Sequence, residues 1–96
     1  MNGWEPSVAI VKSKSFEDVL SFFEKEEFIL KTQDTNHAVL YKEGTSLTFK
    51  SDNCPLFLLI IREDNYIKIH LRYATLVVFD TGDLDKLLEK YINKLG

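Results

Sequence analysis

Apolar residues recur along the chain first at the period of a helix and then at the period of a strand. A β-branched run at 7–11 predicts a first strand. Four apolar residues then follow at i, i+3, i+4 and i+7, the spacing of one face of a helix: Phe16, Val19, Leu20 and Phe23. We expect this helix to run to about residue 27, with Ser15 as its N-cap.

From residue 28 the period changes to two. The alternating or wholly apolar runs predict strands at 28–32, 37–42, 47–50, 56–62 and 66–73, the last continuing toward Asp80 past a bend at 74–75. Turn residues separate them: 33–36, a tight hairpin at 43–45 around Gly44, 51–54, and 63–65. A second apolar stripe predicts the closing helix: Leu84, Leu87, Leu88, Tyr91, Ile92 and Leu95.

This pattern predicts an α+β two-layer sandwich in the order β-α-β-β-β-β-α, with an antiparallel sheet of about five strands and two helices on one face. Each helix has one strong apolar stripe and needs one neighbouring layer, so the other sheet face must meet solvent or a partner. The order resembles, in topology alone, a half-repeat of the TATA-box-binding-protein-like fold and a shortened helix-grip domain. Fold likeness of this kind carries no function.

Size and composition favour one domain over residues 1–96, because 96 residues lie near the lower end of independently stable chains. The chain is 45% hydrophobic and 28% charged, as in ordinary globular proteins, and its net charge is −3. The longest apolar run, 55–61, is too short to span a bilayer, and no charged leader precedes an apolar stretch. We therefore expect a cytoplasmic protein without membrane contact.

The charges are sorted by element. Between residues 28 and 79 the acids fall in predicted turns: Asp34, Glu43, Asp52, Glu63 and Asp64. The bases fall in predicted strands: Lys31, Lys42, Lys50, Lys68, His70 and Arg72. If the strands share one exposed face, that face is basic. The candidate contacts for an anionic ligand such as nucleic acid are Lys31, Lys42, Lys50, Lys68 and Arg72, with Tyr41 or Tyr66 as stacking platforms.

A protein partner is the interpretation we favour, since the 56–73 hairpin also exposes apolar side chains. With a three-residue loop, the face with the cations holds Leu56, Leu58 and Ile60; with a two-residue loop, it holds Phe57, Leu59 and Ile61. Both sets therefore stand as candidates: the partner surface comprises Leu56, Phe57, Leu58, Leu59, Ile60, Ile61, Lys68, His70 and Arg72. Large apolar patches commonly mark interfaces, so we expect a homo-oligomer, with nucleic acid as the alternative.

Catalysis and metal binding have the least support in the sequence. His37 and His70 have no ligands at metal-binding spacing, and Cys54 has no evident base beside it. The pair Asp83 and Asp85 is typical of helix capping. A helix-grip type of small-ligand binder is disfavoured because 96 residues leave little room for a cavity. We expect no enzyme activity and no cofactor.

Overall fold

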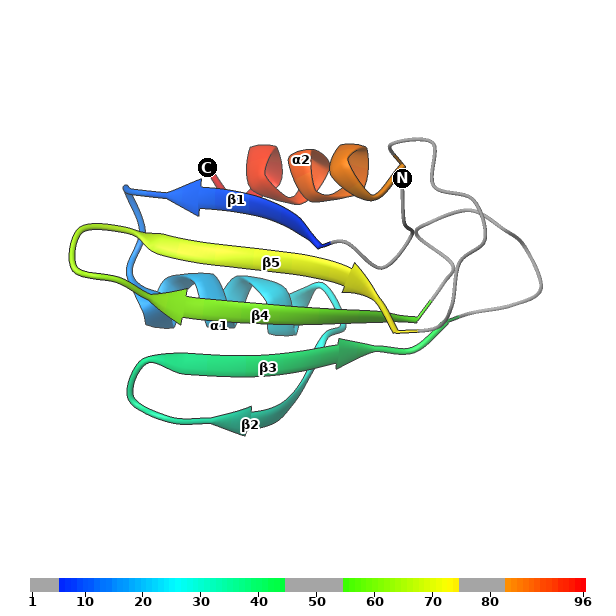
Figure 1. Ribbon diagram of the computed structural model, residues 1–96, viewed down its shortest axis with the longest axis horizontal. Coiled ribbons are helices and arrows are strands. Elements are labelled where there is room, and N and C mark those ends of the chain that lie inside the picture. Colours follow the sequence, from blue (N-terminus) through cyan, green and yellow to red (C-terminus); the bar gives the residue numbers. More distant parts are fainter. Residues whose placement is uncertain (1–5, 45–54, 75–82) are drawn as a thin grey trace.

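The computed structural model describes residues 6–44, 55–74 and 83–96 (Figure 1). Its elements are β1 (Ser7–Val11), α1 (Phe16–Lys25), β2 (Ile29–Gln33), β3 (His37–Lys42), β4 (Leu56–Arg62), β5 (Ile67–Tyr73) and α2 (Asp83–Leu95). The order β-α-β-β-β-β-α and the α+β class are those that the hydrophobic pattern predicts, and both are confirmed.

The strands form one antiparallel sheet in the order β1-β5-β4-β3-β2. The first strand of the sequence therefore lies at one edge, beside the last strand, and β2 forms the other edge (Figure 1). A bulge interrupts the β2–β3 ladder between Leu30 and Thr32. β4 lies at the centre of the sheet and is apolar at six consecutive positions, whereas a strand with only one covered face normally alternates apolar and polar residues.

The expected hairpin between 37–42 and 47–50 is wrong. β3 pairs with β4 along 37–42 and with β2 along 38–41, so both of its edges are occupied. Gly44 indicates a local reversal, but the partner of β3 comes from the more distant residues 56–62. The strand expected at 47–50, the turn at 51–54 and the continuation of the last strand over 75–80 lie outside the described residues.

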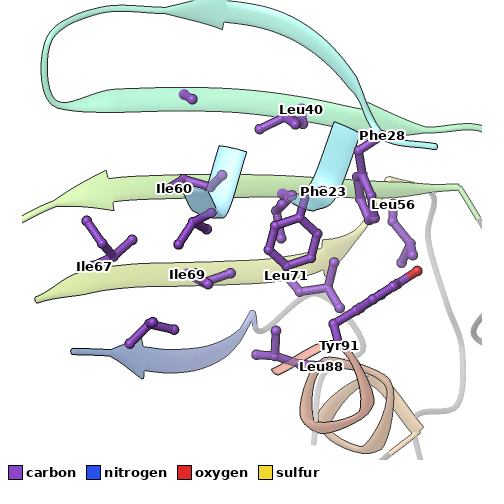
Figure 2. Close-up of a cluster of buried hydrophobic side chains, with 14 of the residues drawn as sticks. Phe23, Phe28, Leu40, Leu56, Ile60, Ile67, Ile69, Leu71, Leu88 and Tyr91 are labelled. Carbon is purple, nitrogen blue, oxygen red and sulfur yellow. The ribbon is translucent and has the colours of Figure 1, made fainter. Parts of the chain in front are cut away.

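The core lies between the sheet and the two helices. Figure 2 shows Phe23 of α1 and Tyr91 of α2 reaching toward each other above the strands, with Phe28 beside them. The three rings make edge-to-face pairs with centroids 5.5 to 5.8 Å apart. This aromatic cluster joins α1, the approach to β2, and α2, so both helices are fixed to the same face of the sheet, as predicted.

Polar contacts fix the ends of the helices. Ser15 caps α1 as expected, because its Oγ accepts a hydrogen bond of 3.1 Å from the Asp18 N–H. Asp85, in the first turn of α2, accepts a hydrogen bond from the Ser7 hydroxyl on β1. Lys94 near the end of α2 pairs with Glu26 at the end of α1, with 2.8 Å between Nζ and Oε2. The last two contacts hold α2 to β1 and to the end of α1.

Candidate functional site

The hairpin register decides which side chains leave the core. β4 pairs with β5 so that Phe57, Leu59 and Ile61 lie opposite Arg72, His70 and Lys68. The Glu63 N–H donates to the Tyr66 carbonyl at 2.9 Å, which closes a two-residue loop and selects the second of the two registers left open by the sequence. Half of the six apolar members of the candidate surface therefore belong to the core, since three of them have no exposed area: Leu56, Leu58 and Ile60.

The other sheet face faces away from both helices, and we call it the open face. In Figure 1 β4 passes in front of α1, so the reader looks onto the open face. Cross-strand pairing arranges its side chains in three rows, each crossing several strands. The rows are Ile29-Tyr41-Phe57-Arg72, Thr32-Val39-Leu59-His70-Val8, and His37-Ile61-Lys68-Ile10. The open face thus has an apolar centre on β4, with Leu59 in its middle.

The first row combines aromatic rings with cations. The rings of Tyr41 and Phe57 lie 5.3 Å apart between centroids. Lys31, from the bulged segment of β2, places its Nζ 5.6 Å from the Tyr41 centroid. The Arg72 guanidinium carbon lies 5.6 Å from the Phe57 centroid. Each ring therefore has a cation within the range of a cation–π contact.

The central row contains the most unusual polar group of the face. His70 lines a hollow of about 510 Å³ together with Pro6, Val39, Phe57, Leu58, Leu59 and Arg72. Its Nε2 is buried and has no hydrogen-bond partner among the described residues. Desolvation first, and the charge of Lys68 second, lower the pKa of His70. The residues opposite it, Leu59 and Val8, are apolar, so this environment favours the neutral imidazole.

Acidic residues are absent from all five described strands, whose charged members are lysine and arginine. One carboxylate beside the open face is that of Asp34, which lies in the β2–β3 turn next to His37. It accepts the backbone N–H groups of Asn36 and His37 at 2.9 and 2.8 Å, and these bonds lower the pKa of Asp34. Its Oδ1 also lies 3.4 Å from His37 Nδ1. Within the described strands the charged residues are therefore all basic, and the acidic residues lie in the turns and segments that follow the strands.

The candidate anionic-ligand residues do not all lie together. Lys31, Lys68 and Arg72 border the open face, whereas Lys42 is on the helix side of β3. Lys42 Nζ donates to the Tyr91 hydroxyl at 3.2 Å and lies 5.7 Å from the Phe28 centroid, so it belongs to the aromatic cluster. Lys50 is outside the described residues.

Sequence reasoning missed two features. The edge residues Val8, Ile10 and Ile29 are 51%, 47% and 53% exposed and extend the open face on both sides. Alternation within 7–11 could have revealed the first two, because residues 7, 9 and 11 face the core. Arg62 is also absent from the expectations: it pairs with Glu17 at 3.1 Å, and its guanidinium carbon lies 4.7 Å from the centroid of the Phe16 ring. Arg62 therefore holds α1 to β4.

Within the described ranges, no three His, Cys, Asp or Glu residues lie close enough to hold a metal ion, and no helix could cross a membrane. The fold and the open face define a small α+β domain, one sheet face of which is covered by its own helices. No family model, curated protein or solved structure matches the chain. The inference of function therefore depends on the open face alone.

Proposed function

We propose that this protein is a small non-enzymatic interaction domain whose open face binds a protein partner, first of all a second copy of itself. The observation that carries the proposal is the apolar strip of Phe57, Leu59 and Ile61 on a face that the helices do not cover. A strand with one wetted face normally alternates apolar and polar residues, and β4 does not. An apolar centre with a charged border is also the usual anatomy of an interface.

The size of the open face sets the expected strength of the contact. Five strands about 4.8 Å apart, each about 17 Å long, give a footprint of about 400 Å² per copy. A stable interface of standard size buries about 800 Å² of accessible surface per partner, so this contact belongs to the small class. We therefore expect association that depends on concentration and that a single charge at the centre can abolish.

Light scattering after size exclusion, over a concentration series, tests the proposal. The mass should rise from the 11.1 kDa of one chain toward twice that value as the concentration increases. Leu59→Lys should hold the protein at the monomer mass, whereas Asn93→Lys, which adds the same charge on the exposed side of α2, should not. A mass of one chain at every concentration, or a Leu59→Lys variant that still associates, would overturn the homodimer.

Nucleic acid is the second candidate, and the aromatic row favours it. Tyr41 and Phe57 with Lys31 and Arg72 supply rings and cations of the kind that bind single strands by stacking and phosphate contacts. Fluorescence anisotropy with a labelled oligothymidine at low salt tests this. Arg72→Glu should abolish binding, and Lys90→Glu on α2 should leave it intact. No binding at low salt, where phosphate contacts are strongest, removes this candidate.

A further inference from the structure

Charge is distributed unevenly across the open face. β5, on one side of β4, carries Lys68, His70 and Arg72, while β3, on the other side, carries His37, Val39 and Tyr41. β4 between them contributes apolar side chains alone to this face. The exposed carboxylate of Asp34 stands next to His37, on the β3 side. The two sides of the open face are therefore different in chemistry, and the division runs along β4.

A closed dimer in which the two open faces meet needs a twofold axis lying in the plane between the sheets. In aligned sandwiches the strand directions differ by about 30°, so the axis runs either nearly along the strands or nearly across them. An axis across the strands sets β5 of one copy on β5 of the other. Lys68 would then meet Arg72 of the second copy in a water-poor contact to which the described strands contribute no carboxylate, an arrangement that like-charge repulsion and desolvation both oppose.

An axis along β4 has the opposite result. It sets β4 on β4, so that Leu59 meets Leu59 of the second copy, and it sets the cationic β5 on β3. Arg72 then faces Tyr41 of the second copy, a suitable ring for a guanidinium. Lys68 faces the end of β3 where the Asp34 carboxylate stands, and His70 faces the apolar Val39. Arg72 thus gains a ring and Lys68 a carboxylate, while the neutral imidazole of His70 meets apolar surface; Lys31 of the second copy, with its Nζ 5.6 Å from the centroid of the same Tyr41 ring, stands beside the first of these contacts.

The twist between packed sheets does not disturb these pairs. Arg72 and Lys68 each lie about 4.8 Å across the sheet and about 6.6 Å along the strand from the central Leu59, so a crossing angle of about 30° displaces them from their facing residues by about 4 Å. Long side chains such as Arg72 and Lys68 easily cover that displacement. Resting on the homodimer proposed above, we infer that a second copy docks on the open face about a twofold axis along β4, with β5 of each copy on β3 of the other.

Site-specific cross-linking distinguishes the two axes. Packed sheets lie about 10 Å apart, so a bis-maleimide of that reach is the suitable reagent, and Cys54→Ser removes the native thiol. Two single-cysteine variants, Arg72→Cys and Tyr41→Cys, are mixed, one of them carrying a mass tag. A second mixture pairs Arg72→Cys with Lys68→Cys. If the axis runs along β4, the yield of mixed cross-linked dimer from the first mixture should be at least five times that from the second.

The second mixture is the control for the other axis, because an axis across the strands brings residues 72 and 68 together. Light scattering on each variant shows whether it still associates. Dimer mass with the 72–41 cross-link supports the inference. If the variants have the mass of a dimer but give the 72–68 cross-link, or give no cross-link in either mixture, the inferred axis along β4 is overturned. The proposed homodimer is not affected by that result. Monomer mass of the unsubstituted protein overturns the homodimer, and the inferred axis with it.

Discussion

The end of α1 contains a backbone conformation that a single substitution should improve. Glu27 has φ 74°, the left-handed region that suits glycine. The residue is held there by a Schellman motif: the Phe28 N–H donates to the Phe23 carbonyl at 3.0 Å, and the Glu27 N–H donates to the Glu24 carbonyl at 3.2 Å. The contact between the Phe23 and Phe28 rings completes the motif. We predict that Glu27→Gly stabilises the protein.

The magnitude follows from two opposing effects. A side chain with a Cβ in this conformation costs about 1 to 2 kcal/mol relative to glycine. Glycine in turn costs about 0.4 to 1 kcal/mol through the greater freedom of the unfolded chain. Removing a negative charge from the C-terminal end of a helix adds about 0.3 to 1 kcal/mol. The net gain in the free energy of unfolding is about 1 kcal/mol, or about 4 to 8 °C in Tm for a domain of this size.

Denaturant unfolding of three variants, followed by circular dichroism at one protein concentration, checks this prediction. Glu27→Ala removes the charge and keeps the Cβ, so it should gain only the electrostatic part. Glu26→Gly is the comparison variant, because its φ of −88° gives glycine no advantage; it should destabilise the protein through the greater freedom of the unfolded chain and through the loss of the ion pair with Lys94. The reasoning is refuted if Glu27→Gly is no more stable than Glu27→Ala.

Three further predictions use the same unfolding measurement. Leu58→Ala should lower the free energy of unfolding by about 2 to 5 kcal/mol, because Leu58 has no exposed area. Leu59→Ala should lower it clearly less in the monomer, and equal losses would contradict the assignment of Leu58 to the core face and Leu59 to the open face. Ser15→Ala should cost about 1 kcal/mol by removing the cap of α1, and no change would show that the cap contributes nothing. The pKa of His70 is lowered in the folded protein, so the free energy of unfolding is not reduced by this residue above the unfolded pKa, about 6.5, and falls as the pH drops from there through the lower folded pKa. The unsubstituted protein should therefore lose more stability between pH 7 and pH 5 than His70→Gln, and parallel pH profiles would refute this.

The sequence was sufficient for most of the fold because local periodicity reports which residues face a core. The stripe on α1, its Ser15 cap and the run at 56–62 are all local signals, and the structure confirms them. The failures concern choices that local signals do not determine. Gly44 indicates a reversal but not the strand that follows it in space, and the partner of β3 is set by packing across the whole sheet. Lys42 shows the same limit, since its side of the sheet depends on where β3 lies.

The composition of the central strand is the reason for proposing the open face as a binding site. β5 shows what a wetted sheet face requires: its core positions are Ile67, Ile69, Leu71 and Tyr73, and its outer positions are Lys68, His70 and Arg72. β4 has the same core pattern but places Phe57, Leu59 and Ile61 at the outer positions. Folding alone does not require those three, because the helices already cover the other face and polar residues there would suit water better. Their presence beside Val39 makes the apolar surface contiguous across two strands, so a partner that removes it from water gains stability in proportion to the area buried.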